Sequence, residues 1–146
     1  MREKNIFTWN CINTWKKSAQ NTFWCLIGCA IGDLGTILYF QLTEISFPVL
    51  GIMVLAIING IITSILLETF ILMRQKFIFV EALKVASGMS LISMVSMEVA
   101  MNLTDYALTG GAILNLWVLP IMLLVGFLTP WPYNYWRLKK HNLSCH

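Results

Sequence analysis

The placement of the charged residues constrains this chain more than any other feature of its sequence. All ten lysines and arginines fall in three clusters, and residues 18–73 and 85–136 contain none of them. A run of about 20 predominantly apolar residues has the length of a helix that crosses a bilayer. These two long stretches without a basic residue therefore predict an all-α, multi-pass membrane protein.

Composition excludes several other classes of protein. Hydrophobic residues make up 58% of the chain and charged residues 12%, with a net charge of +3 and a mean hydropathy of +0.71. A soluble domain is about 45–50% apolar and about 25% charged. These values exclude a soluble enzyme and a disordered chain, and the scattered basic clusters lack the contiguous basic face of a nucleic-acid binder. No nucleophile–base pair stands out, so we expect no enzymatic activity.

Four apolar runs predict an integral membrane four-helix bundle within residues 21–136. The predicted spans are residues 22–40, 47–70, 82–103 and 113–133. Pro130 and Pro132 are expected to end or bend the fourth helix.

The basic residues also predict how these spans are oriented. The connections 41–46 and 109–111 lack Lys and Arg, whereas the segment 74–84 is basic. Because positive residues accumulate on the cytoplasmic side, we expect both termini to be cytoplasmic and the protein to lie in the cell membrane. Residues 1–20 are expected to form a cytoplasmic interfacial segment, and residues 137–146 a cytoplasmic basic tail.

Acidic residues within or at the ends of the predicted spans have no Lys or Arg beside them in the bilayer. They are Asp33, Glu68, Glu98 and Asp105. A charged group at the centre of a bilayer costs about 2.5–3.5 kcal/mol on insertion scales. Each acid must therefore be protonated, hydrogen-bonded to a neighbouring helix, exposed to water or bound to a cation, and the sequence leaves these alternatives open.

Two of the predicted helices carry groups of potential metal ligands on one face. Cys25, Cys29 and Asp33 recur every four residues and therefore share a face. Gly28 and Gly32, beside this face, predict close packing against another helix. On the third span a second face combines Met94, Glu98, Asn102 or Met101, and Asp105 at the helical period. The four cysteines are not expected to form a disulfide framework.

The chemistry of these side chains predicts a site for a transition metal. Thiolates and thioethers favour Cu(I), while carboxylates favour harder ions, so we expect copper before zinc or iron. The predicted ligands are Cys25, Cys29, Asp33, Met94, Glu98, Met101 and Asn102, with Glu68 and Asp105 at the ends of a path. Neither His141 nor His146 lies in a predicted span, so we expect no haem in the membrane. A proton relay through Asp33 and Glu98 stays open as an alternative.

Three segments also resemble a known family. They are Asn21-Thr22-x-x-Cys25-Leu26-x-Gly28-Cys29-x-Ile31-Gly32-Asp33-x-x-Gly35, then Ser93-Met94-x-Ser96-Met97-Glu98 with Asn102, and finally Thr129-Pro130 through Tyr135-Trp136 with Asn134. Together they resemble a family of short prokaryotic membrane proteins catalogued as a domain of unknown function. The resemblance implies four transmembrane helices and no particular activity.

Two classes of function follow from the sequence. In the first, the protein binds a transition-metal ion within the bilayer and transports, stores or delivers it. In the second, it is a non-catalytic accessory subunit of a larger membrane enzyme, for example a copper-dependent oxidase or monooxygenase. The expected partners are the bilayer and either other membrane subunits or a second copy, without nucleic acid. Asn59, Thr63 and Asn115 are the polar residues that a partner subunit would use.

Overall fold

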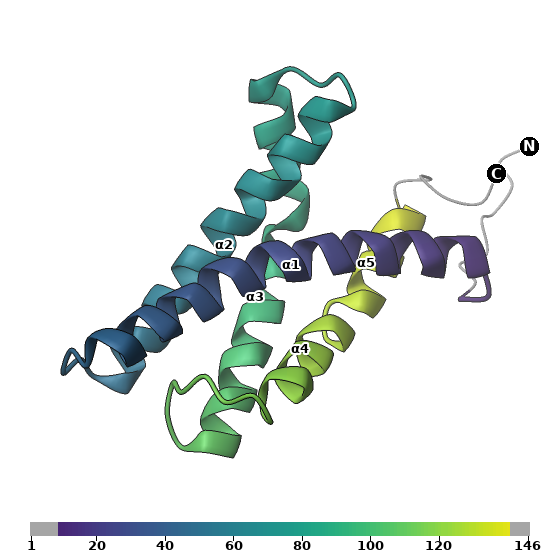
Figure 1. Ribbon diagram of the computed structural model, residues 1–146. Coiled ribbons are helices and arrows are strands. Elements are labelled where there is room, and N and C mark those ends of the chain that lie inside the picture. The colour runs from purple at the N-terminus through teal and green to yellow at the C-terminus, as the bar shows by residue number, and fades with distance from the viewer. Residues whose placement is uncertain (1–8, 141–146) are drawn as a thin grey trace, which may run out of the picture.

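The structure is a computed structural model that describes residues 9–140, apart from the side chains of residues 89 and 90. Its elements are α1 (Ile12–Thr43), α2 (Val49–Arg74), α3 (Phe79–Thr109), α4 (Leu119–Leu128) and α5 (Trp131–Lys140) (Figure 1). The described part contains no strand, so the all-α prediction is confirmed. The outer parts of the two predicted cytoplasmic segments, residues 1–8 and 141–146, lie outside the described residues, and so do His141 and His146.

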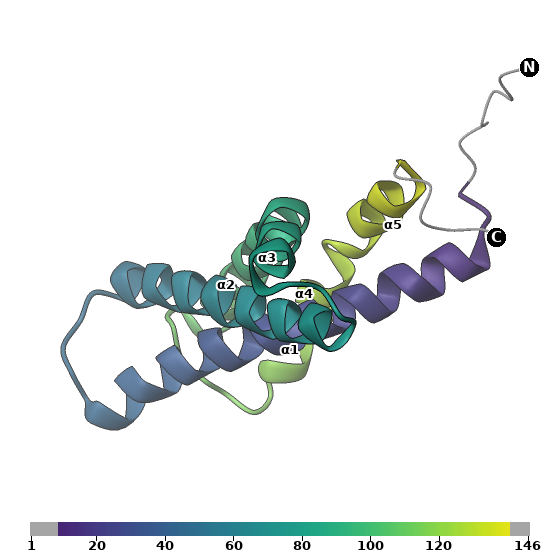
Figure 2. The same cartoon turned by 90° about the horizontal axis from the view of Figure 1, so that it is seen from above.

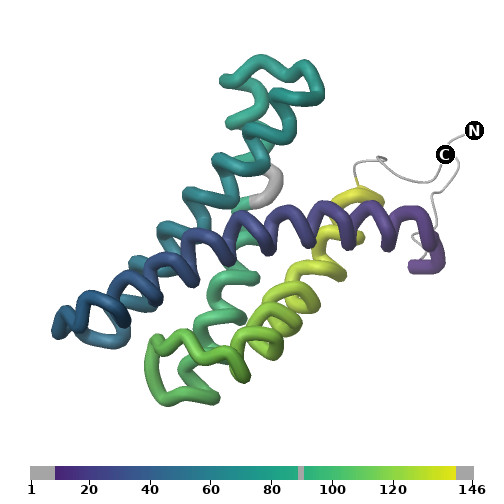
Figure 3. Tube along the Cα trace, viewed as in Figure 1, coloured from purple at the N-terminus to yellow at the C-terminus, as the bar shows by residue number. Residues whose placement is uncertain are grey.

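Two helices, α1 and α2, are long and apolar enough to cross a membrane. The third, α3, consists of the parts Phe79–Gly88 and Leu91–Thr109, inclined to each other by 54°, and it raises the number to three if both parts belong to one span (Figure 3). In hydrocarbon the backbone must satisfy its own hydrogen bonds, and a continuous helix does so. The chain is therefore a helical membrane protein with two or three clear spans in its described part.

The fourth predicted span, residues 113–133, is not one continuous helix. Residues 113–118 are irregular, α4 has only 10 residues, and α5 begins at Trp131 after a short turn. At 1.5 Å per residue α4 is about 15 Å long, roughly half the thickness of the hydrocarbon core. Pro130 lies in the turn and Pro132 in the first turn of α5, which confirms that these prolines interrupt the helix.

The first helix begins at Ile12, well before the start near residue 22 that hydropathy predicts. The reason is tertiary packing, because the early part of α1 lies beside α5 (Figures 1 and 2). The Asn134 amide donates to the Thr22 hydroxyl at 2.7 Å, and the rings of Trp15 and Tyr135 stack with centroids 4.2 Å apart. Part of the predicted interfacial segment is thus continuous with the first membrane helix.

Glycines bring α1 and α2 into close contact. A methyl group on Gly28 would lie 2.6 Å from the Cα of Ser64, and one on Gly32 would collide with the main chain of Asn59 and the hydroxyl of Thr63. The Thr63 hydroxyl uses this proximity to donate to the Gly28 carbonyl at 2.6 Å. The predicted close packing at Gly28 and Gly32 is confirmed, and α2 is the helix that they face.

The core lies where α1, α2 and α3 meet. Its buried residues on α2 are small, with Ala56, Gly60 and Ser64 along one face, so α3 also approaches closely. α4 packs on the other side of α3, where a methyl group on Gly126 would lie 2.5 Å from Cγ of Met101. Side chains of α3 are therefore enclosed by three helices, and this enclosure positions the candidate site.

Candidate metal centre

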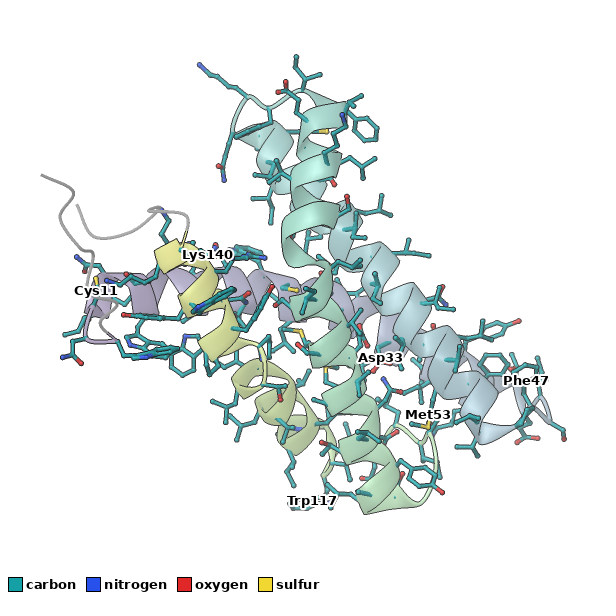
Figure 4. The ribbon with its side chains drawn as sticks, turned by 180° about the vertical axis from the view of Figure 1, so that it is seen from behind. Cys11, Asp33, Phe47, Met53, Trp117 and Lys140 are labelled. Carbon is teal, nitrogen blue, oxygen red and sulfur yellow. The ribbon has the colours of Figure 1, made fainter. Side chains whose placement is uncertain are left out.

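All seven predicted metal ligands lie in the core. None of them is more than 2% exposed. Three come from α1 and four from α3, which lies some 60 to 70 residues further along the chain. The seven are Cys25, Cys29, Asp33, Met94, Glu98, Met101 and Asn102. Figure 4 places Asp33 near the middle of the molecule, where the helices meet. The structure thus brings together residues that the sequence analysis could only assign to separate faces.

Sulfur-bearing side chains form one buried cluster. Among the described residues it contains two thiols and four thioethers, from Cys25, Cys29, Met94, Met97, Met101 and Met122, with Leu26 beside them. Both thiols are free. The Cys25 sulfur lies 3.4 Å from the Ser64 hydroxyl, and the Cys29 thiol interacts with that of Cys25. The cluster therefore joins soft donors from α1, α3 and α4.

Oxygen-bearing side chains gather beside the sulfur cluster. The Asn102 amide nitrogen donates to Oδ1 of Asp33 at 2.9 Å and to the main-chain carbonyl of Glu98 at 3.1 Å. Four buried oxygens have no hydrogen-bond partner: Oδ2 of Asp33, both carboxyl oxygens of Glu98 and Oδ1 of Asn102. The Cys29 thiol interacts with the Glu98 carboxyl, but not in the geometry of a hydrogen bond. An unsatisfied buried acceptor costs about 1–3 kcal/mol. We therefore expect these four oxygens to bind a hydrogen-bond donor or a cation.

Glu98 occupies its position because residue 60 is a glycine. A methyl group on Gly60 would collide with the Glu98 carboxyl and would lie 3.0 Å from the Cys29 carbonyl oxygen. The carboxyl group is thus held between α1 and α2. Gly60 therefore leaves space for the Glu98 side chain and also allows two helix backbones to approach each other.

The two predicted path ends, Asp105 and Glu68, interact with groups outside the cluster of predicted ligands. Asp105 is buried, but its carboxyl accepts from the Ile113 main chain at 3.1 Å and from the Thr109 hydroxyl at 3.3 Å. These bonds close the turn that follows α3 and give Asp105 a structural role. Glu68 is half-buried on α2 and lies within electrostatic reach of Arg137 on α5.

Two polar side chains of α5, Arg137 and Asn134, lie at the end of the bundle beside α1. Burial lowers the pKa of the Arg137 guanidinium from its ordinary value, and the Glu68 carboxylate acts in the opposite direction. Asn134 is buried and is held by its bond to Thr22. Together these contacts fasten α5 to α1 and α2. The thiol of Cys11, which lies just before α1, is in a disulfide bond, whereas Cys25 and Cys29 are free.

The polar residues assigned to a partner subunit have contacts within the chain. Asn59 donates to the Thr36 hydroxyl at 2.8 Å, and Thr63 bonds to the Gly28 carbonyl. The Asn115 side chain accepts from the Trp117 main chain at 3.1 Å in the turn before α4. Asn59 and Asn115 are nevertheless exposed, and their use by a partner subunit stays a prediction.

Sequence reasoning missed four contributors to the site, namely Gly60, Ser64, Met97 and Met122. Met97 lies three residues from Met94, one helical turn away, and this spacing could have identified it. Ser64 and Gly60 share a face of α2 by the same argument, but nothing in the sequence says that this face meets Cys25 and Glu98. Among the described residues, no three His, Cys, Asp or Glu side chains are placed to hold a metal ion together. Beside the two thiols, the further donors within the sulfur cluster are thioethers.

The fold and the buried site define a class, that of small helical membrane proteins with a polar and sulfur-rich core. The family described as "Domain of unknown function (DUF4396)" matches residues 14–142. The chain belongs to this family. No curated protein and no solved structure matches it.

Proposed function

We propose that the protein binds a soft transition-metal ion, Cu(I) before zinc or iron, inside a four-span bundle whose two ends face the cytoplasm. The observation that carries this proposal is the buried cluster of six sulfur side chains from three helices. Cu(I) favours thiolate and thioether ligands. In this proposal Cys25 and Cys29 are the first ligands, and Met94, Met97 and Met101 complete the set from α3.

The charges of these ligands suit an ion held in a bilayer. A single cysteine thiolate neutralises Cu(I), and thioethers add donors without adding charge. The centre is neutral when one of the two cysteines binds as a thiolate and the other keeps its proton, and this avoids the cost of a net charge in hydrocarbon. A site built from several carboxylates would not have this property for a monovalent ion. Transport, storage and delivery of the ion are all compatible with such a site.

Removal of the two buried thiols tests the proposal directly. The protein is extracted in mild detergent, loaded anaerobically with Cu(I), freed of excess metal and assayed for copper per chain. We expect about one copper ion per parent chain and a loss of at least about tenfold in affinity, equal to about 1.4 kcal/mol, in the Cys25→Ser/Cys29→Ser variant. The control is Met73→Leu, which removes an exposed thioether. Full copper binding by the double variant, or none by the parent protein, would contradict the proposal.

The proposed topology rests on the basic segment 74–84 and is tested by cysteine labelling in cells. A membrane-impermeant maleimide should label Ile45→Cys, in the α1–α2 connection, from outside. Lys76→Cys, in the α2–α3 turn, should react only after the membrane is opened. The disulfide at Cys11 is the observation that opposes a cytoplasmic start of α1, because such bonds persist in oxidising compartments. Labelling of Lys76→Cys in intact cells would reverse the orientation.

An accessory subunit of a larger membrane enzyme is the second candidate. It is favoured by an apolar groove of about 580 Å³ along α3, where a partner helix could lie. Its lining includes Leu91, Ile92, Val95, Val99 and Leu103. A native separation of the solubilised membrane distinguishes the candidates. Migration in a large complex without copper favours a subunit, whereas a small copper-loaded species favours a metal carrier.

A further inference from the structure

We propose a second cation site beside the sulfur cluster, formed by Asp33, Glu98 and Asn102 and specific for a hard divalent cation such as Mg²⁺ or Mn²⁺. The first step of the argument is hydrogen bonding. Four oxygens of these three residues are buried without a hydrogen-bond partner. Carboxylate oxygens and the amide oxygen only accept hydrogen bonds. A partner for all four must therefore be a donor or a cation.

The orientation of Asn102 points to a cation. Its amide nitrogen is committed to Asp33 and to the Glu98 carbonyl, at 2.9 and 3.1 Å. These two bonds fix the plane of the amide and leave its oxygen unpartnered, although the residue is only 2% exposed. This neutral oxygen is an observation independent of the two acids.

Charge determines the class of cation. The carboxyls of Asp33 and Glu98 lie within electrostatic reach of each other, and neither forms an ion pair with a Lys or Arg among the described residues. Two carboxylates carry two negative charges, which a divalent cation cancels completely. Hard divalent cations such as Mg²⁺ and Mn²⁺ are bound by oxygen ligands. The four oxygens therefore suit an ion that the sulfur cluster would reject.

The two sites separate on the surface of α3. Met101 faces α4, where it contacts Gly126, while Glu98 faces Gly60 on α2 and Asn102 faces Asp33 on α1. Soft and hard donors thus lie on adjacent faces of one helix. The two sites are neighbours, since the Cys29 thiol interacts with the Glu98 carboxyl, but the ligands of each can be substituted while those of the other remain.

Binding of Mn²⁺ to the full-length protein in mild detergent tests this site. Free Mn²⁺ is followed by its electron paramagnetic resonance signal, and bound metal is counted after equilibrium dialysis. We expect about one Mn²⁺ per chain, with affinity weakened at least about tenfold in Glu98→Gln and in Asp33→Asn. Glu81→Gln is the matched control, because it removes an exposed carboxylate from the same helix. The Cys25→Ser/Cys29→Ser variant should bind Mn²⁺ as the parent protein does.

Each other outcome overturns the proposal. If the parent protein binds no Mn²⁺, or if Glu98→Gln and Asp33→Asn bind it unchanged, the two carboxyls are protonated and no cation site exists. If a correctly eluting Cys25→Ser/Cys29→Ser protein loses Mn²⁺, the sulfur and oxygen groups form one mixed site. Should the isosteric variants fail to elute as folded protein, Asn102→Ser takes their place, because it removes the unpartnered amide oxygen without altering a charge. Unchanged Mn²⁺ binding by that variant has the same meaning.

Discussion

Gly32→Leu is expected to lower the free energy of unfolding in mild detergent by about 1–3 kcal/mol or more, the range for overpacked cores. Any Cβ at this position collides with the main chain of Asn59 and with the Thr63 hydroxyl. Backbone atoms of α2 cannot rotate away, so the two helices must separate. Separation would also break the bond from Thr63 to the Gly28 carbonyl. Thermal or denaturant unfolding followed by circular dichroism measures the effect.

The same helix provides the control for this experiment. A side chain added to Gly35 meets nothing within 4 Å, so Gly35→Leu tests the same chemical change without a collision. Leucine also favours a helix over glycine, and we expect the stability of this variant to match or exceed that of the parent protein. Equal losses in the two variants would mean that α1 does not pack against α2 through Gly32.

Hydropathy and prolines predicted much of the fold. The runs near residues 47–70 and 82–103 correspond to α2, which starts two residues later and ends at Arg74, and to α3, which is longer at both ends. A bilayer leaves a long apolar segment no alternative to a helix. The early start of α1 could not be predicted in this way. Residues 12–21 are polar, and their helix is stabilised by packing against α5, more than 100 residues further along the chain. A hydropathy average is calculated for each segment separately, so it contains no information about the packing of α5 against α1.

The site was predictable to the extent that helical periodicity describes it. A spacing of four residues was enough to group Cys25, Cys29 and Asp33, because side chains at that spacing share a face whatever surrounds the helix. It could not say whether Met101 or Asn102 belongs with Glu98. Both are buried, since α3 is enclosed by three helices and its buried arc is wider than one stripe. The division into soft and hard donors depends on which neighbour each face meets, and this appears only in three dimensions.

Position along the helix explains why the Asp105 carboxyl has hydrogen-bond partners while most oxygens of Asp33 and Glu98 have none. Asp105 lies at the end of α3, where main-chain donors of the following turn are within reach. Asp33 and Glu98 lie within helices whose main-chain donors are already used in helical bonds. Among the described residues, the hydrogen bond that reaches these carboxyls comes from the Asn102 side chain, which donates to one oxygen of Asp33. The remaining oxygens must obtain a proton or a cation, and this is why they are the centre of the proposed oxygen site.

The contact between Gly60 and Glu98 leads to a second large effect, which a double-mutant cycle can isolate. Gly60→Ala is expected to destabilise the protein by about 1–3 kcal/mol, because the new methyl group collides with an enclosed carboxyl group that is fully buried. In a Glu98→Ala background the carboxyl is absent, and only the Cys29 carbonyl, 3.0 Å away, still opposes the methyl group. The same glycine substitution should then cost at least about 1 kcal/mol less, a coupling typical of residues in contact.

The matched cycle combines Gly35→Ala with Glu98→Ala. These two positions share no contact, since nothing lies within 4 Å of a methyl group on Gly35, and their effects on the free energy of unfolding should add within about 0.3–0.5 kcal/mol. Additivity in the Gly60 cycle as well would place the Glu98 carboxyl away from α2. The oxygen site would then lose its enclosure, because the Glu98 carboxyl would no longer be held against Gly60. Coupling at Gly60 and its absence at Gly35 is therefore the pattern that the proposed position of Glu98 requires.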